Sequence, residues 1–424
     1  MPIFALIDCN NFYASCERVF NPRLDNKAVV VLSNNDGCII ARSNEAKKLG
    51  IPMGAPYHIW KSFCKKHNVF VFSSNYPLYG DMSHRVMKLI ESYCPSIEVY
   101  SIDEAFITLD SFQNFNINQY IIQLKNIIKK FTGIPVSIGI GPTKTLAKIA
   151  NNYAKKQTKV GVFSLLDEHI REKVLAQFPV ENIWGVGSQI TKRLIPHKIF
   201  NAKDLHNADL KTLRKCFSVV IEQTIKELRG TACYGLEEAT PRKQIVSSRS
   251  FGKSVKTLQE LEEALSHYAS IACSKLRKQG SLARGVSVFI QTNFFQQNRP
   301  QYGNSAYYEF PTPTSDTSYV IYIAKLCLRK IFKNGYEYHK TGIMLMDLLP
   351  NSVYQYNLFN QDDIEPKRDK LIKTVDKINL NLGKNSLFFA AEGVERSWRL
   401  RAQMRSSRYT TQWKELPLVY CNRN

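Results

Sequence analysis

The sequence predicts an α+β protein, and its 424 residues suggest about three or four domains. Strand-like and helix-like segments alternate over residues 3–154 and again over 245–349, with a mainly helical stretch between them. The hydrophobic content of 44% is enough for several buried cores, which argues against a mainly disordered chain. The formal net charge of +22 indicates a polyanionic partner, most simply nucleic acid.

Signals for a membrane or for secretion are missing from the sequence. No apolar run approaches the roughly 20 residues of a spanning helix, and the N-terminus has no basic leader. The ten cysteines are scattered, without a C-x-x-C pair or a zinc-like spacing, and we interpret them as reduced core thiols. We therefore expect a cytoplasmic protein without a membrane partner.

The first domain starts with a strand at residues 3–7, followed by a helix that begins within 10–17. Strands at 29–32 and 38–41 flank the segment 34–37 (Asn-Asn-Asp-Gly), a strong hairpin signal. Further elements are expected as helices at 43–49, 79–93, 117–131 and 144–154, and as strands at 97–102, 105–109 and 136–141. This order is typical of an antiparallel sheet with helices on one face.

A helical section, a second α+β domain and a tail follow. Within the helical section, Gly185 and Gly187 predict a tight turn whose exposed N–H groups can face a phosphate. After a short linker, residues 245–349 have the order strand, helix, strand, strand, helix, strand. From 351 to 424 the periodicity weakens, which predicts a partly ordered tail.

Three acidic residues carry the strongest chemical signal. Asp103 and Glu104 interrupt the hairpin predicted at 97–109, and Asp8 follows the first strand. Ionised carboxylates in a buried hairpin are costly unless they are paired or bound to a metal. Three of them on rigid strand ends can hold two Mg²⁺ ions, which clamp the reacting oxygens of an in-line phosphoryl transfer. The alternative is that these acids cap turns or pair with surface lysines.

Four motifs occur in an order and at a spacing that are specific in combination. They are Asp8 with Phe12-Tyr13-Ala14-Ser15-Cys16-Glu17, Tyr100-Ser101-Ile102-Asp103-Glu104-Ala105, the stretch from Gly139 to Lys148, and Gly185-Val186-Gly187. Over nearly its whole length the chain resembles Y-family translesion DNA polymerases. It is most similar to the UmuC-type catalytic subunit of bacterial DNA polymerase V, also at residues 32–38, 72–76 and 406–411.

The resemblance implies a right-hand polymerase with an α+β palm, small fingers, a helical thumb with a Gly-turn hairpin, and an α+β little finger. The palm would comprise residues 1–17 and 75–165, the fingers 18–74, the thumb 166–240 with its helix-hairpin-helix, the little finger 241–350, and a C-terminal tail 351–424.

The resemblance also assigns the acidic residues. Asp8, Asp103 and Glu104 match the catalytic, metal-binding triad of the family, and the carbonyl of Cys9 would be a further ligand of two Mg²⁺ ions. Tyr13 matches the residue that packs under the sugar and leaves no room for a 2′-hydroxyl. For a single tyrosine near a helix start, a place in the core is the alternative.

Three basic residues would contact the triphosphate of the incoming dNTP. Lys47 and Lys155 match family positions with this role. The first position is commonly Arg in the family, and the neighbouring family Tyr is Asn44 here. A lysine cannot replace the bidentate fork of an arginine, so the triphosphate contact at Lys47 would be weaker. Arg42 is close in sequence and could compensate for it. For each of these residues, an exposed solvated charge is the alternative.

Further basic residues would bind primer-template DNA through its phosphates. Lys144 and Lys148 belong to a basic run without acids, although a solvated helix face is the alternative. The turn at Gly185 and Gly187 resembles the thumb hairpin of the family. In the little finger, the predicted contacts include Arg249, Lys253 and Arg284.

The tail contains Gln355, Leu358 and Phe359, which resemble a sliding-clamp-binding peptide. A C-terminal strand that anchors the tail is the alternative. In the UmuC-type family such tails engage the processed UmuD′ dimer and the RecA filament, and these partners are implied by the resemblance only.

The resemblance implies error-prone translesion DNA synthesis in the SOS response to DNA damage. The chain would transfer a nucleotide from a dNTP to the primer 3′-hydroxyl, without proofreading. A template-independent dCMP transferase, a catalytically silent scaffold that binds DNA and the clamp, and a two-metal nuclease remain as alternatives. The nuclease would not explain Tyr13 or the triphosphate lysines.

Overall fold

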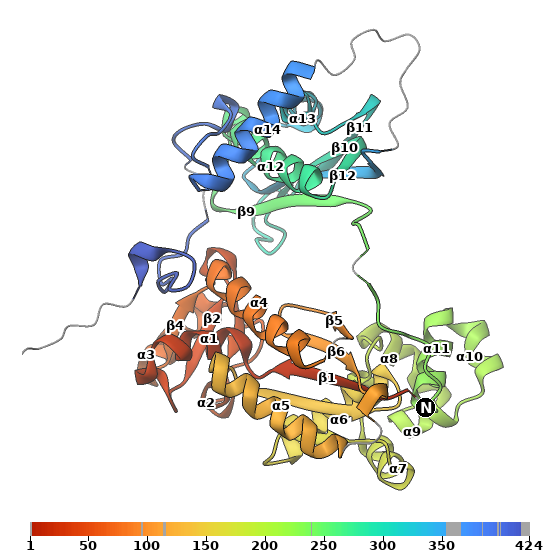
Figure 1. The fold of residues 1–424 in the computed structure, drawn as a ribbon. Helices are drawn as coiled ribbons and strands as arrows, with labels where there is room; N and C mark the ends of the chain where they lie inside the picture. The colour runs from red at the N-terminus through yellow and green to blue at the C-terminus, as the bar shows by residue number, and fades with distance from the viewer. Residues whose placement is uncertain are drawn as a thin grey trace, which may run out of the picture. The chain divides into compact units, whose positions relative to one another are not determined.

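The computed structural model describes residues 2–94, 96–112, 116–238, 240–352, 366–383, 385–396, 398 and 400–416. The chain forms two compact units, one of residues 1–239 with 403–424 and the other of residues 240–402 (Figure 1). None of the helices in the described part of the chain has the length and apolar character that crossing a bilayer requires.

A five-stranded sheet with the order β5-β6-β1-β7-β8 is the centre of the first unit. Its middle strand β1 (Phe4–Cys9) pairs antiparallel with β6 (Glu104–Thr108) and β7 (Val136–Gly141). β5 (Ile97–Val99) forms one edge, and β8 (Val162–Ser164) pairs parallel with β7 at the other. All six residues of β1 are buried, so the strand is covered on both faces.

The helices around this sheet lie on both of its faces, so the prediction of helices on one face is wrong. α4 (Tyr76–Tyr93) and α5 (Ile117–Thr132) pack on the face that carries the odd-numbered residues of β1, and α6 (Lys144–Gln157) packs on the opposite face. Gly139 explains how close α6 comes, because a Cβ added there would lie 2.0 Å from the backbone nitrogen of Asn151. The bare backbone of this glycine lets the helix lie directly on β7.

A small three-stranded sheet with the order β3-β2-β4 follows β1 in the chain. The hairpin of β2 (Val29–Leu32) and β3 (Ile39–Arg42) is confirmed, and β4 (Phe70–Ser73) pairs parallel with β2. The helices of this part are α1 (Phe12–Phe20), α2 (Asn44–Lys48) and α3 (Tyr57–Lys66).

The helical section contains α7 (Glu168–Gln177), α8 (Ser188–Leu194), α9 (Ala202–Asn207), α10 (Leu210–Cys216) and α11 (Val219–Leu228). The predicted tight turn is confirmed, since Gly185 has a φ of +85° and Gly187 precedes the first residue of α8. No atom lies within 4 Å of a Cβ added to either glycine, so the turn is open on its outer side.

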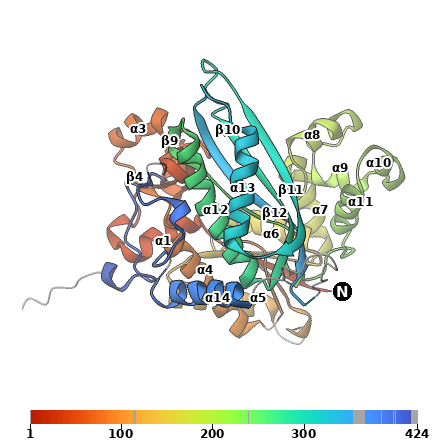
Figure 2. The same cartoon turned by 90° about the horizontal axis from the view of Figure 1, so that it is seen from above.

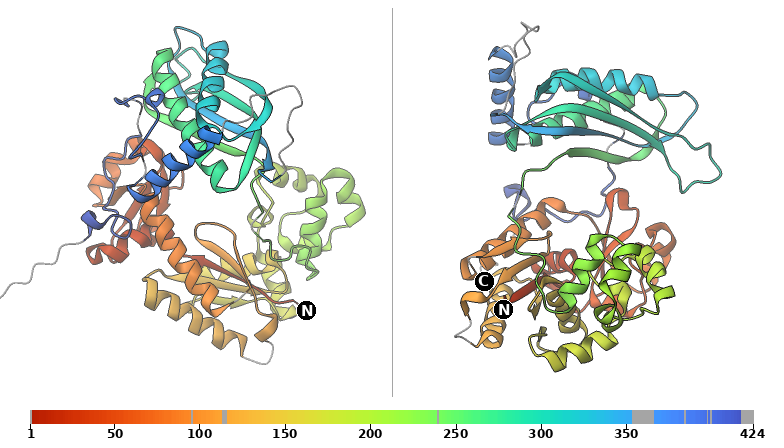
Figure 3. Two further views of the ribbon diagram at one scale, coloured as in Figure 1. Left: turned by 45° about the horizontal axis from the view of Figure 1, so that its top comes forward. Right: turned by 90° about the vertical axis from the view of Figure 1, so that its right-hand side faces the viewer.

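The second unit has the predicted order of strands and helices. They are β9 (Ile245–Val255), α12 (Leu258–Lys278), β10 (Ser281–Thr292), β11 (Gly303–Thr314), α13 (Thr317–Ile331) and β12 (Tyr338–Pro350). The sheet has the order β11-β10-β12-β9, and α12 and α13 lie side by side on one face of it (Figures 2 and 3). The core of this unit fills the space between the two helices and the sheet.

The segment predicted as one tail is divided between the two units. α14 (Pro366–Asn381) and the residues up to 402 belong to the second unit, where Glu392 is 1% exposed and accepts hydrogen bonds from Ser270 and Arg396. Residues 403–416 pack on the first unit. Single buried side chains hold this segment, which explains why its sequence shows little periodicity.

Candidate active site

The register of the central sheet brings the three predicted catalytic acids together. Asp8 lies opposite Glu104 as its cross-strand partner, and the backbone nitrogen of Cys9 donates to the carbonyl of Asp103 at 2.8 Å. Asp103 lies in the turn between β5 and β6, directly before Glu104. The acids therefore come from the adjoining ends of two paired strands.

Asp8 is a buried carboxylate with one cationic partner. Asp8 is 7% exposed, and its Oδ2 lies 2.5 Å from the Nζ of Lys155. Burial raises the pKa of Asp8 to about 7, Lys155 opposes this shift, and the nearby Glu104 adds to it. The ionised form of Asp8 therefore needs positive charge nearby, which Lys155 supplies in part.

Glu104 is paired with Lys148 through an Oε2–Nζ distance of 3.0 Å. The same ammonium group lies over the rings of Tyr100, Phe106 and Trp184, at 4.4, 5.8 and 5.4 Å from their centroids. Lys148 is thus directed at a catalytic acid within an aromatic cage. Its predicted contact with DNA phosphate stays a prediction.

The set of acids fits a divalent cation. The carboxylate oxygens of Asp8 and Glu104 are hard ligands of the kind that Mg²⁺ prefers, and their mutual repulsion is what a cation would relieve. The Oδ1 of Asp103 accepts from the hydroxyl of Ser101 at 2.7 Å, and the charge of Asp103 acts on both Cys9 and Tyr13. No three acidic, histidine or cysteine side chains in the described part of the chain are grouped as a metal site.

Two of the three predicted triphosphate cations, Lys155 and Lys47, lie near Asp8, and the third, Arg42, lies near Lys47. Burial lowers the pKa of Lys47, the nearby charges of Arg42 and Lys155 lower it further, and Asp8 opposes the change. The Nζ of Lys47 donates to the Oδ1 of Asn11 at 2.6 Å. A lysine whose protonation is opposed by neighbouring cations is suited to binding an anion.

A cavity of about 170 Å³ beside Lys155 extends this positive region. Lys125, Lys129 and Lys159 line it together with Lys155. Burial lowers the pKa of Lys125, and the charge of Lys129 lowers it further. The cations predicted from sequence are therefore only part of the positive charge near Asp8.

Tyr13 is half-buried at the start of α1 and packs flat against another tyrosine. Its ring is stacked on that of Tyr79, with centroids 4.5 Å apart and planes at 14°, and Tyr76 meets it edge-on. Burial raises the pKa of Tyr13 to about 12, so its hydroxyl stays protonated. The ring is held as a rigid wall, which is what exclusion of a sugar substituent requires.

The prediction that Lys144 contacts DNA is wrong. This lysine is 2% exposed, forms an ion pair with the Oε2 of Glu98, and lies 5.0 Å from the ring centroid of Phe106. Lys144 and Lys148 lie one helical turn apart on α6, and their side chains reach Glu98 on β5 and Glu104 on β6. Both lysines neutralise acids of this hairpin.

The remaining predicted DNA contacts are exposed. Arg249, Lys253 and Arg284 lie on the surface of the second unit, on β9 and β10. No partner molecule tests them, so these contacts stay predictions. The predicted clamp residues Gln355, Leu358 and Phe359 lie outside the described residues.

Sequence reasoning missed several residues of the site. Trp184 directly precedes the glycine turn, and its Nε1 donates to the hydroxyl of Tyr100 at 3.1 Å. Asn11, with a left-handed φ of +48°, holds Lys47 and donates to Asn44 at 3.0 Å. An isolated asparagine or tryptophan carries no periodic signal, although an asparagine just before a helix is a weak one.

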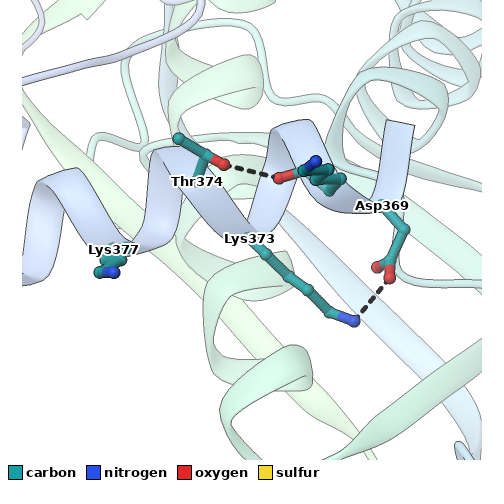
Figure 4. A pocket seen from close by; sticks show the side chains of 5 residues that line it. Asp369, Lys373, Thr374 and Lys377 are labelled. Carbon is teal, nitrogen blue, oxygen red and sulfur yellow. Dashed lines mark hydrogen bonds and ion pairs between the residues drawn. The ribbon is translucent and has the colours of Figure 1, made fainter. Parts of the chain in front are cut away.

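A second cavity, of about 300 Å³, lies along α14 in the other unit (Figure 4). Its lining comes from one helix and includes Asp369, which is paired with Lys373 at 2.6 Å, and the exposed residue Lys377. It gathers neither perturbed acids nor an aromatic wall. The cavity along α14 therefore offers less for catalysis than the region around Asp8, which stays the candidate site.

Comparison with known families agrees with this geometry. Residues 7–152 match the impB/mucB/samB family, and residues 242–358 match the C-terminal domain of the same family. The chain belongs to the impB/mucB/samB family. Residues 369–419 match a domain of unknown function.

Relatives within this family align over nearly the entire chain. The chain is 44% identical to protein UmuC of Salmonella typhimurium and 41% identical to protein MucB of Escherichia coli, in both cases over 98% of this chain and 99% of the relative. It is also 28% identical to DNA polymerase IV 2 of Bacillus subtilis, over 92% of this chain and 94% of the relative.

Solved structures show the same fold. A Y-family DNA polymerase chimera built on Dbh matches with a TM-score of 0.66 and 21% identity, over 82% of this chain and all of that one. The insertion ternary complex of Dbh DNA polymerase matches with a TM-score of 0.56, at the same identity and coverage of this chain. The predicted resemblance and the α+β right-hand polymerase fold are confirmed.

Proposed function

We propose that this member of the impB/mucB/samB family is a DNA-directed DNA polymerase that performs error-prone translesion synthesis in the SOS response. It transfers a nucleotide from a dNTP to the primer 3′-hydroxyl on primer-template DNA. The observation that supports this most strongly is the buried Asp8, which lies opposite Glu104, is paired with Lys155 and has Lys47 nearby. Acids can hold metal ions, and cations beside them can bind a polyphosphate, so the arrangement suits metal-assisted nucleotidyl transfer from a triphosphate.

Asp8, Asp103 and Glu104, with the carbonyl of Cys9, would hold two Mg²⁺ ions. Bound there, the ions would supply the positive charge that activates the primer hydroxyl and neutralises the triphosphate. Asp103 would take part while its Oδ1 accepts from the hydroxyl of Ser101 at 2.7 Å, because a carboxylate has a second oxygen. In the absence of metal ions, Lys155 forms an ion pair with Asp8 and Lys148 forms one with Glu104.

Binding of the triphosphate would draw Lys155 away from Asp8 and toward the phosphates. Lys47 and Arg42 would bind the same group, and the buried Nε of Arg42 has no hydrogen-bond partner in the described part of the chain. Tyr13, stacked on Tyr79, would lie under the sugar and exclude a 2′-hydroxyl. The open turn at Gly185 would hold DNA phosphates without reading sequence.

We also propose partners beyond DNA and dNTPs. A UmuD′-like dimer is supported by the full-length similarity to a protein named UmuC. A sliding clamp, bound through Gln355, Leu358 and Phe359, and a RecA filament are supported by the family resemblance. A cytoplasmic location is consistent with contact with all of these partners.

The experiment is primer extension past an abasic site with Mg²⁺ and all four dNTPs. Wild type and Asp103→Ala are compared with and without clamp, UmuD′ and RecA filament; we expect extension by the wild type and none by the variant, and extension that requires the partners would support the polymerase V assignment. Asp25→Ala is the matched control, because Asp25 is exposed and distant in sequence from the acidic motifs. Tight DNA binding without extension under every condition would favour the silent scaffold. Insertion of dCMP whatever the template base would favour the transferase.

A further inference from the structure

Residues 403–411, called the C-terminal segment below, are built into the first unit. The backbone nitrogen of Ser73 donates to the carbonyl of Met404 at 3.0 Å, and that of Met404 donates to the Oγ of Ser73 at 3.0 Å. The side chain of Met404 joins the core around β2, and Tyr409 joins the core between the central sheet and α4. The segment therefore packs on two separate cores of one unit.

Asn75, the residue before α4, ties the segment to this helix. It is 0% exposed, and its Nδ2 lies 3.0 Å from the carbonyl of Ser406, 2.9 Å from its Oγ and 3.1 Å from the carbonyl of Ser407. Every hydrogen-bond partner of this nitrogen in the described part of the chain comes from the C-terminal segment. A buried amide donor needs such partners, so the segment completes the start of α4.

The hydroxyl of Ser406 also donates to a buried acid. The Oε1 of Glu17 accepts from Ser406 at 3.0 Å and from the hydroxyl of Tyr79 at 2.6 Å, and Glu17 is 2% exposed. Burial raises the pKa of Glu17. The two donors hold this acid in one position, and the acid in turn fixes the orientation of the Tyr79 ring.

The relay ends at Tyr13. The ring of Tyr79 stacks on that of Tyr13, so a hydrogen bond that fixes Tyr79 also fixes the Tyr13 ring, which is proposed to lie under the sugar. The segment also holds the other end of the helix that carries Tyr13, because Tyr409 stacks on Phe20 with centroids 4.8 Å apart and planes at 13°. Both ends of α1 thus depend on the same segment.

We propose that the C-terminal segment is a specificity-determining part of this polymerase. Ser406 is a positioning residue, which acts through Glu17 and Tyr79 to hold Tyr13 against the sugar of the incoming nucleotide. The ligand class it discriminates is the 2′-deoxynucleoside triphosphate against the ribonucleoside triphosphate. This inference rests on the proposed function, and it assigns a role to part of the domain of unknown function.

The test uses the full-length chain and single-nucleotide insertion of a dNTP and of the matching rNTP. Ser406→Ala is expected to lower the ratio of the two kcat/KM values by roughly two- to tenfold, the range that one lost hydrogen bond spans. Ser406→Thr retains the hydroxyl and should restore the ratio. Ser92→Ala, at an exposed serine on α4, is the matched control and should not change it.

A merely structural segment would give a different result. It would lower the kcat/KM of both nucleotides alike and leave their ratio unchanged in Ser406→Ala, which would overturn the inference. In a Tyr13→Ala background, Ser406→Ala should have no further effect on the ratio, because the wall is already absent. An additional effect there would also overturn it.

Two further variants keep the inference falsifiable. If Ser406→Ala does not fold, Tyr79→Phe is used instead. It removes the hydrogen bond from the Tyr79 hydroxyl to Glu17 and keeps the ring that stacks on Tyr13. An unchanged ratio in Tyr79→Phe would overturn the inference. If Tyr13→Ala itself leaves the ratio unchanged, the proposed role of Tyr13 fails first, and this outcome is distinct from failure of Ser406 alone.

Discussion

Asp8 links the chemistry of the site to the stability of the metal-free protein. Burial raises its pKa from 3.8 to about 7, and Glu104 adds to the shift while Lys155 opposes it. A carboxyl with a higher pKa in the folded state stabilises the fold while it is protonated, and this stabilisation is lost as the pH rises through the folded value. The difference, 7 minus 3.8, corresponds to roughly 4 kcal/mol at about 1.36 kcal/mol per pKa unit.

The perturbation is Asp8→Asn, which keeps the shape and removes the ionisation. Between about pH 5 and about pH 8 the wild type should lose roughly 2–3 kcal/mol of stability that the variant keeps. For a unit of this size, this corresponds to a divergence in Tm of roughly 5 to 10 °C. The variant should be the more stable protein at high pH, although it is inactive.

The assay is thermal unfolding in EDTA across this pH range. Asp25→Asn serves as the control, because an exposed aspartate should leave the pH dependence of the wild type unaltered. Added Mg²⁺ should stabilise the wild type at pH 8 and stabilise Asp8→Asn much less, since binding to the folded state raises Tm. Parallel pH profiles for wild type and Asp8→Asn in EDTA would refute the reasoning.

Three other outcomes are expected. Lys144→Met should destabilise the fold by about 3–5 kcal/mol, because Glu98 is left buried without its cation, while the salt dependence of DNA binding stays the same. Gly139→Ala should prevent folding, since a Cβ there meets the backbone of α6, and thermal unfolding should then show no cooperative transition. Gly80→Ala, on the exposed side of α4, should be tolerated. Tyr13→Ala should admit ribonucleotides in primer extension, and unchanged sugar discrimination would contradict its role.

Local patterns predicted most of the secondary structure. The spacing of apolar residues placed β1 and the hairpin of β2 and β3, as well as the order of elements from β9 to β12. Local patterns also marked Asp8 at the end of a strand and Glu104 in a hairpin, without pairing the two. These features depend on neighbours in the chain, which periodicity reports directly.

The fates of the lysines on α6 could not be predicted in this way. Lys144 and Lys148 lie on one helical face and read alike in the sequence, yet Lys144 is buried against Glu98 and Lys148 faces Glu104 in an aromatic cage. Their surroundings depend on which acid each side chain reaches, Glu98 on β5 or Glu104 on β6, and tertiary contacts decide this. The basic run therefore indicated positive charge on α6 without indicating which groups the individual lysines contact.

By itself, the sequence determined the α+β order of elements, the three acids and the tyrosine beside them, because these are local patterns. Only the tertiary structure decided that α6 covers the second face of the sheet and that Ser406 reaches Glu17 across 389 positions of the chain. The physical reason is that single hydrogen bonds and stacked rings between distant segments leave no period in the sequence.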